Sequence, residues 1–253
     1  MTSRRAILLP ATALLLAVTG CSSDGASPVP TSTAAVGAPA DASGAFDPAA
    51  AIAHGFREPY VTAFEMVVET GEGPEKEVFT TTGRTNHNTS EEGSRSETKT
   101  VRGSEVVMWE EQVTADGVRH RRDKTEDRPR WTTDPKALVA PRNDADITAG
   151  FVKVLLDAGP AARKGMETEA GVPVYHLAAR LSPAEMRRAD PCYGNGGQQN
   201  AGTEGVDCEL WIDRLGRMVR AEHSTVVAGQ RVVTKEHYSD FGPVETFTPP
   251  TTG

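Results

Sequence analysis

The chain has 253 residues, a length that suits one or two domains, and a formal net charge of −8. This acidic balance argues against nucleic acid and anionic lipid headgroups as electrostatic partners. Hydrophobic residues make up 38% of the chain, enough for one core, and beyond the first 20 residues no apolar run approaches the length of a membrane span.

The first 20 residues are typical of a secretory signal peptide. Arg4 and Arg5 precede an apolar run over 6–18 that contains Pro10 and falls short of the roughly 20 residues that cross a bilayer. The run ends in VTGC, which resembles the bacterial lipobox, in which the cysteine is diacylated and becomes the first mature residue. We therefore expect an exported chain that is lipid-anchored through Cys21 to the outer face of the cell membrane. An ordinary signal peptide cleaved a few residues later is the alternative.

Residues 21–45 are expected to be a disordered tether behind the lipidated cysteine. They contain no aromatic residue and no periodicity, so they cannot offset the entropy that ordering would cost. A chain of this length reaches about 25–30 Å. The folded domain is expected over residues 46–250.

Strand patterns follow a short helix that begins at Asp47-Pro48, where a capping side chain precedes a proline. In YVTAFEMVVETG (60–71) the apolar residues Phe64, Met66 and Val68 alternate with other side chains, which indicates a strand with one apolar face. The polar, β-branched stretches 77–87 and 94–103 predict solvated or edge strands. Strands at 104–114 and 118–126 flank a turn at Ala115-Asp116-Gly117.

The middle of the chain predicts a helix over 144–158, because apolar residues recur there at helical spacing and Gly159-Pro160 ends the pattern. A strand follows at 171–181, and Ser182 with Glu185 forms a capping box that opens a short helix. The clearest hairpin lies at 208–227, with Asp213 and Gly216 at the ends of its turn. A last strand at 230–242 brings the total to eight to eleven antiparallel strands.

Two cysteines remain besides Cys21. In an exported chain, Cys192 and Cys208 are read as a disulfide that closes a glycine-rich loop of about 15 residues, worth roughly 3 kcal/mol in the chain-entropy model. A metal or redox role for the pair is the weaker alternative, since the sequence has no CxxC spacing and no histidine lies beside the loop.

The hairpin ELWIDRLGRMVR, a further strand and then YSDFGPVETFTPP, all behind a lipobox and a tether, resemble the LolA-like superfamily, and within it the lipoproteins of the LppX and LprG type. The resemblance spans residues 46–250. It implies an α+β fold, in which a strongly curved antiparallel sheet forms a half-barrel and helices pack on its concave face. It also implies an apolar cavity between sheet and helices that receives acyl chains. The low aromatic content and the expected disulfide loop depart from the family pattern and leave the size of such a cavity open.

On this basis we expect an envelope lipoprotein that binds or carries a lipid or glycolipid. Its cavity would be lined by one apolar set from strands and helix: Phe64, Met66, Val68, Trp109, Phe151, Leu155, Leu210 and Ile212. The alternative is a self-filled core without ligand, in which case the domain is a protein-binding or sensory module with an envelope protein as its partner.

Catalytic chemistry finds no support in the sequence. The six histidines are scattered without a ligand spacing, and no nucleophile elbow, Walker loop or dinucleotide fingerprint is present. We expect no enzyme, cofactor or metal, and no nucleic-acid partner. The mixed charges of RHRRDKTEDRPR (119–130) indicate a solvated hairpin face, or else a headgroup-recognition patch at the cavity mouth. Trp131 and Trp211 could also line a cavity, but a tryptophan on a strand is more often a core residue.

Overall fold

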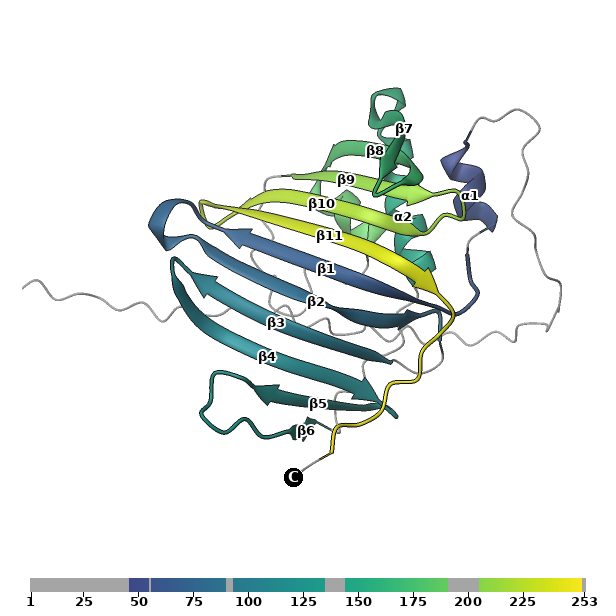
Figure 1. The fold of residues 1–253 in the computed structure, drawn as a ribbon. Coiled ribbons are helices and arrows are strands. Elements are labelled where there is room, and N and C mark those ends of the chain that lie inside the picture. The colour runs from purple at the N-terminus through teal and green to yellow at the C-terminus, as the bar shows by residue number, and fades with distance from the viewer. Residues whose placement is uncertain (1–45, 55, 90–92, 135–143, 191–204, 252–253) are drawn as a thin grey trace, which may run out of the picture.

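A single antiparallel sheet dominates the computed structural model, which describes residues 46–54, 56–89, 93–134, 144–190 and 205–251 (Figure 1). Its eleven strands lie in the order β6-β5-β4-β3-β2-β1-β11-β10-β9-β8-β7. The strands are β1 (Tyr60–Thr70), β2 (Glu77–His87), β3 (Ser94–Arg102), β4 (Glu105–Ala115), β5 (Val118–Asp123), β6 (Thr132–Asp134), β7 (Arg163–Glu169), β8 (Val172–Leu181), β9 (Val206–Asp213), β10 (Met218–Val227) and β11 (Gln230–Gly242). Every neighbouring pair is antiparallel, and the count lies at the top of the predicted range.

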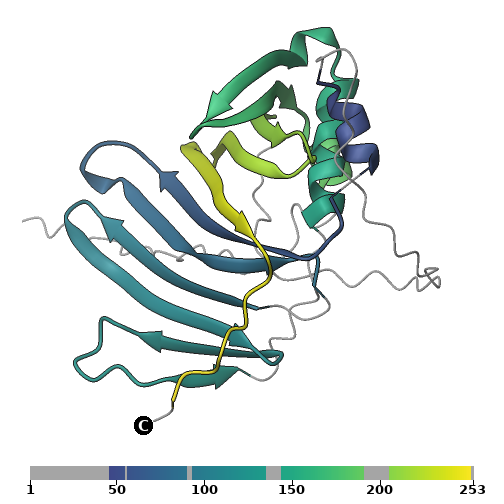
Figure 2. The ribbon, with the colours of Figure 1, turned by 45° about the vertical axis from the view of Figure 1, so that its right-hand side comes forward.

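The sheet is strongly curved but stays open, with β6 and β7 as its two edges (Figure 2). Register shifts interrupt the β1–β11, β3–β4, β7–β8 and β9–β10 ladders. Such bulges bend a strand and increase its twist, which is how a long sheet is curled. The predicted α+β class, a half-barrel of antiparallel strands with helices on its concave face, is confirmed.

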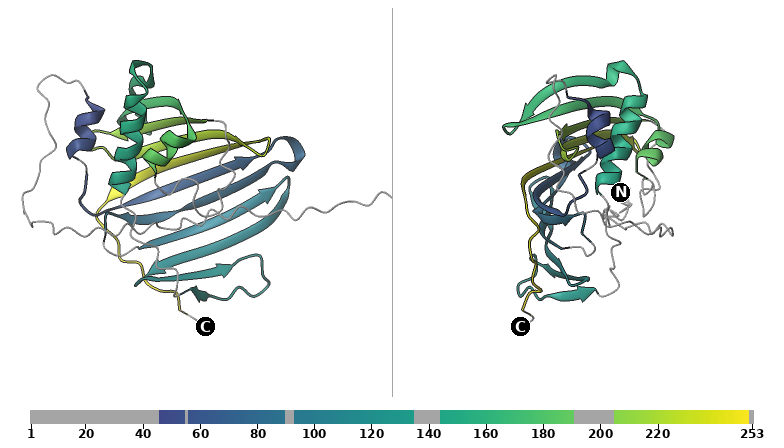
Figure 3. Two further views of the ribbon diagram at one scale, coloured as in Figure 1. Left: turned by 180° about the vertical axis from the view of Figure 1, so that it is seen from behind. Right: turned by 90° about the vertical axis from the view of Figure 1, so that its right-hand side faces the viewer.

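Three helices lie on the concave face: α1 (Pro48–His54), α2 (Asp144–Asp157) and α3 (Pro183–Ala189). They gather over the β8–β10 end, while no described helix lies over β2–β5 (Figure 3). Two short 3₁₀ turns, Gly73–Glu75 and Pro160–Ala162, complete the helical structure of the described residues.

Local signals place these helices as predicted. The Ser182 hydroxyl accepts from the Glu185 backbone N–H while the Glu185 carboxylate accepts from the Ser182 backbone, so the predicted capping box opens α3. α2 and α3 approach each other closely at Gly150, where an added Cβ would lie 2.3 Å from the Ala189 carbonyl oxygen. Glycine at this position therefore permits the contact between the two helices.

The main core fills the space between these helices and strands β8 to β10. Its buried members are Phe151, Val152, Val154, Leu155, Leu177, Leu181, Met186, Ala189, Val206, Cys208, Leu210, Ile212 and Ala221. No residue of β1 to β6 belongs to this cluster. The hydrophobic core is thus concentrated at one end of the sheet.

The hairpin turn between β9 and β10 forms as predicted. The Asp213 carboxylate accepts hydrogen bonds from the backbone N–H groups of Leu215 and Arg217, and Gly216 has φ +79°. These bonds hold a tight turn in which a residue with a side chain would be strained at position 216.

The polar stretches at 77–87 and 94–103 turn out to be interior rather than edge strands. β2 is paired with both β1 and β3, and β3 with both β2 and β4. Their side chains are mostly half-buried because no described helix packs against them. The polar character of these strands marks a part of the sheet that no described helix covers, not its edge.

Candidate functional site

Three apolar side chains of β1 lie on the concave face outside the main core: Phe64, Met66 and Val68. Met66 is paired with Glu236, Glu236 with Ala221 and Ala221 with Leu210. Because directly paired residues share a face, Met66 lies on the side of the sheet on which Leu210 packs against α2. Phe64 and Val68 are on the same face by alternation.

This apolar surface extends across the neighbouring strands. Val68 is paired with Phe79, Phe79 with Thr100 and Thr100 with Met108. Val68 is buried, while Phe64, Phe79 and Met108 are half-buried. The resulting apolar surface (Phe64, Met66, Val68, Phe79 and Met108) lies outside the main core. We call it the β1 surface.

Four of the expected lining residues lie in the main core instead. Leu155 and Ile212 are fully buried, and Phe151 and Leu210 belong to the same close-packed cluster. Phe151 also stacks on His223 of β10, with ring centroids 5.3 Å apart. At the helix-covered end, the described side chains therefore fill the space between helix and sheet.

Trp109 lies on the opposite, convex face. It is paired with Lys99 of β3. The adjacent pair, Thr98 of β3 with Glu110 of β4, belongs to the concave face, and successive residues of a strand point to opposite faces. The ammonium groups of Lys99 and Lys124 lie 5.5 and 4.2 Å from the centre of the indole ring. Trp109 is thus not placed beside Phe64, Met66 and Val68.

Hydroxyl side chains cover much of the remaining concave face. One row runs from Thr62 through Thr85 and Ser94 to Thr114, and it continues to Arg119 of β5. In the next rows the hydroxyls of Thr81 and Thr98 are hydrogen-bonded to each other at 3.0 Å. The Thr62 hydroxyl contacts the His87 ring nitrogen Nε2 at 2.7 Å. The concave face thus combines an apolar part with a part that can hydrogen-bond a ligand.

Ionisable groups also lie on this face. Burial raises the pKa of Glu110, and the nearby charge of Arg121 offsets this only in part. Burial lowers the pKa of His223, against the opposing effect of Glu236 and Asp190. Both shifts favour the neutral form of the side chain, as expected for groups shielded from water.

The charged segment 119–130 contributes to both faces. Arg119 and Arg121 lie on the concave face, where their partners are Thr114 and Gln112. Arg122 lies on the convex face and, with Arg95, binds the carboxylate of Glu111. Burial raises the pKa of Glu111, but these two guanidinium groups outweigh it and hold the pKa below its usual range. On the convex side, the segment fits the interpretation as a solvated hairpin face. Headgroup recognition stays a proposal for the concave side.

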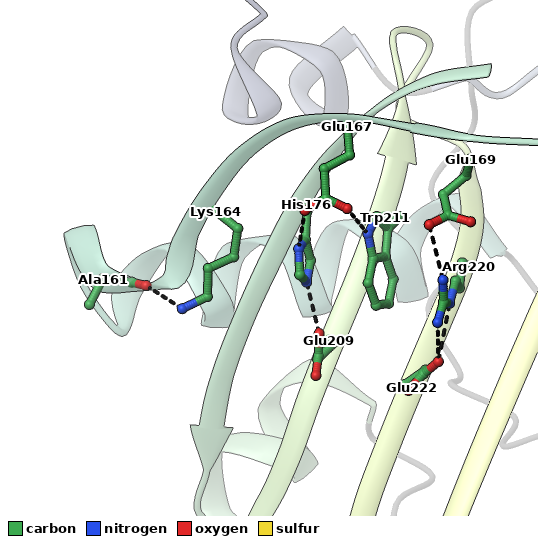
Figure 4. A network of polar contacts seen from close by, with 9 residues as sticks. All are labelled: Ala161, Lys164, Glu167, Glu169, His176, Glu209, Trp211, Arg220 and Glu222. Carbon is green, nitrogen blue, oxygen red and sulfur yellow. Dashed lines mark hydrogen bonds and ion pairs between the residues drawn. The ribbon is translucent and has the colours of Figure 1, made fainter. Parts of the chain in front are cut away.

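A second polar network holds the β7–β10 end together on the convex face (Figure 4). The His176 ring contacts Glu167 through Nδ1 at 2.8 Å and Glu209 through Nε2 at 2.9 Å. Trp211 donates its indole N–H to Glu167 at 2.9 Å and lies stacked between His176 and Arg220. Trp211 is buried, in line with its interpretation as a core residue.

This network links β7, β8, β9 and β10 through side-chain contacts. Both nitrogens of His176 are occupied by carboxylates, and no serine, threonine or cysteine is within hydrogen-bonding distance of it among the described residues. The described residues contain no group of three or more histidine, cysteine, aspartate or glutamate side chains that could hold a metal ion. Trp211 and His176 hold the pKa of Glu167 below its usual range, so this carboxylate is ionised at neutral pH.

Of the three cysteines, only Cys208 lies within the described residues. It is buried in the main core, its Sγ is 3.4 Å from Met186 Sδ, and burial raises its pKa to about 12. Cys192 and Cys21 lie outside the described residues, so the disulfide and the lipid anchor stay predictions. No helix in the described parts of the chain is long and apolar enough to cross a membrane.

A groove of about 440 Å³ lies between α1 and α2, away from the sheet. Its lining consists of Ala49, Ile52, Ala149, Gly150, Lys153, Leu156 and Asp157. No strand residue takes part, so this groove is separate from the β1 surface.

Comparison with known proteins yields similarity only among solved structures. The chain matches no family model and no curated protein. It is similar to the lipoprotein LppX of Mycobacterium tuberculosis at 12% identity, over 79% of this chain and 97% of that chain, with a TM-score of 0.40. It is similar to LprF of Mycobacterium bovis at 13% identity, over 83% and 100% of the two chains, with a TM-score of 0.41.

A LolA superfamily protein of Nitrosomonas europaea is also similar, at 8% identity and a TM-score of 0.24, over 78% of this chain and 93% of that chain. The sequence resembles LppX-type lipoproteins and the LolA-like superfamily, and the similar solved structures include one protein of each kind.

Proposed function

We propose that this protein is an envelope lipoprotein whose curved sheet binds an amphiphile on its concave face. One observation carries the proposal: the apolar side of β1, with Phe64, Met66 and Val68, continues past the helix-covered core and is packed by no described helix. Ligand sites are lined mainly by apolar side chains of this kind, which are half-buried or buried but lie outside the main core.

The energetics suit an acyl chain. Each methylene transferred from water to an apolar surface contributes about 0.8 kcal/mol, so a tail that covers the β1 surface with a handful of methylenes gains several kcal/mol. The rows of threonine and serine beside this surface can hydrogen-bond the polar part of the same molecule. An amphiphile therefore matches the concave face better than a purely apolar or purely polar ligand.

The residues expected to line the cavity fall into two groups along the sheet. The core residues Phe151, Leu155, Leu210 and Ile212 hold the helices on β8 to β10, whereas Phe64, Met66 and Val68 contact the ligand. Phe79 and Met108 join them, since they lie in the row of Val68. Trp109 has no part in this lining, because it lies on the convex face.

The same proposal includes the location of the protein in the cell envelope. Export by the signal peptide 1–20, acylation of Cys21 and the tether 21–45 would hold the domain 46–250 at the outer face of the cell membrane. A tether of about 25–30 Å reach lets the concave face approach lipids without leaving the membrane surface. Lipid or glycolipid is the ligand class that this location offers.

A second candidate function is a protein-binding or sensory module without a ligand. It is favoured by the tight packing of the helix-covered end, where Leu155 and Ile212 are fully buried in contact with their neighbours. In that case the β1 surface would contact an envelope protein.

A titration of the mature chain with a fluorescent fatty acid tests the proposal. We expect saturable binding by the wild type and loss of most of the affinity in Met66→Gln. The control is Val67→Gln on the same strand, because Val67 is paired with Lys235 and Thr80 on the convex face. Equal binding by both variants, or no binding by the wild type, would contradict the proposal and favour the protein-binding module.

A further inference from the structure

Two neighbouring polar groups at the far end of the concave face have no hydrogen-bond partner among the described residues. The Thr114 hydroxyl is buried, with 3% of the residue exposed, and the Nε atom of Arg119 is buried as well. Thr114 and Arg119 are directly paired across β4 and β5, so both side chains lie on the same face, at the same level of the sheet. Buried polar groups in folded proteins nearly always have a partner, so this pair requires one.

The surroundings of the pair are polar. Ser94 is the cross-strand neighbour of Thr114, and Asp134 is the neighbour of Arg119 on β6. Glu110 lies close enough for Arg119 to lower its pKa, although burial raises it overall. The guanidinium N–H and the threonine O–H are donors in this setting, and both can be satisfied at once by the oxygen atoms of one headgroup.

The distance from the β1 surface to Arg119 suits an acyl tail together with its polar group. Arg119 lies four strands away from Phe64 and Met66 and two to four residues along the strand direction. At about 4.8 Å per strand and 3.3 Å per residue, the path along the sheet is roughly 20–23 Å. An acyl tail that fills one leaflet of a bilayer is about 15 Å long, and the polar group extends it further.

We propose that Thr114 and Arg119 form the headgroup subsite for the amphiphile, and that they bind an anionic oxygen group, a carboxylate in the simplest case. This inference rests on the proposed function, since it places the polar end of the same ligand. The net charge of −8 opposes long-range attraction of an anion. The two donors act at hydrogen-bonding range, where a guanidinium that is partly shielded from water selects an anionic acceptor over a neutral one.

The test compares dodecanoate with dodecanol, which share one tail and differ in the headgroup, by titration calorimetry of the mature chain at pH 8. We expect the wild type to prefer dodecanoate by about tenfold or more, since a hydrogen bond to a charged group is worth at least that factor. Arg119→Gln should bring the two affinities together by weakening dodecanoate alone. Arg130→Gln, in the exposed connection between β5 and β6, changes the net charge equally and should leave the preference intact.

Thr114→Val provides a second test in case Arg119→Gln fails to fold. It removes the unpartnered hydroxyl at constant shape, so the melting temperature of the unliganded protein should stay the same or rise while dodecanoate binding weakens. Equal affinities of the wild type for both compounds would overturn the headgroup subsite and leave the proposed function standing, as would a preference unchanged in both variants. A wild type that binds neither compound would refute the proposed function itself.

Discussion

Replacing Leu155 by tryptophan distinguishes a packed core from a ligand cavity at the helix-covered end. Leu155 is fully buried between α2 and the sheet, in one cluster with Met186 of α3 and Leu210 and Ile212 of β9. Added volume has no free space there, so it must displace neighbouring side chains or the helix. Overpacking of this kind costs about 1–3 kcal/mol.

For a domain of this size, each kcal/mol lowers the melting temperature by about 2–4 °C, so Leu155→Trp should lower it by roughly 2–12 °C. The assay is thermal unfolding followed by circular dichroism, together with fatty-acid titration at 20 °C. Amphiphile binding should persist in this variant, because Leu155 lies outside the β1 surface. The matched change Met66→Trp should do the opposite, with little loss of stability and much weaker binding. A Leu155→Trp protein of unchanged melting temperature that has lost its ligand would show that the helices enclose a cavity, and would refute the assignment of Leu155 to a filled core.

The other predictions concern pH dependence, the anchor and the disulfide. Burial lowers the pKa of His223 in the folded chain, whereas in the unfolded chain this histidine binds a proton below about pH 6.5. The free energy of unfolding should therefore decrease as the pH falls from 7.5 to 5.5. Urea unfolding should show a smaller decrease over this range in His223→Leu than in the wild type, and an equal decrease would assign the effect to other groups. Cys21→Ser should release the protein from the membrane or leave it uncleaved, because stable anchoring requires acyl chains; a correctly cleaved variant in the membrane fraction would exclude lipidation at Cys21. Peptide mapping without reductant should find Cys192 linked to Cys208, and reduction should lower the melting temperature by several degrees; two free thiols would disprove the bridge.

Features encoded by neighbouring residues could be predicted from the sequence. The alternation in β1, the helical spacing of α2, the capping box at Ser182 and the turn at Asp213 all depend on a few adjacent side chains, and each forms as expected. β7 (Arg163–Glu169) has no such signal, because an exposed edge strand needs no apolar alternation. The interior position of β2 and β3 depends on the strand order, which no local pattern encodes.

The sequence indicates which side chains of β3 share a face, but it leaves open which side chains of β4 lie on the concave face. In β3, serine and threonine alternate with charged residues, a pattern of period two that could have revealed the hydroxyl-lined face, with Ser94, Ser96, Thr98 and Thr100 on one side. In β4, Met108 and Trp109 are adjacent, so only one of them can face the concave side. The register decides for Met108, and a bulge opposite Thr100 and Val101 makes that register unpredictable from alternation alone.

Native mass spectrometry tests the central claim most directly. The mature chain would be purified from its own envelope, with Cys21 replaced by serine and the leader exchanged for one cleaved by the general signal peptidase. Proposed binding at the β1 surface predicts a series of adducts with the masses of amphiphiles, strongly reduced in Met66→Gln and retained in Val67→Gln. A wild-type protein that appears only at the mass of its own polypeptide, or adducts that persist equally in both variants, would contradict it.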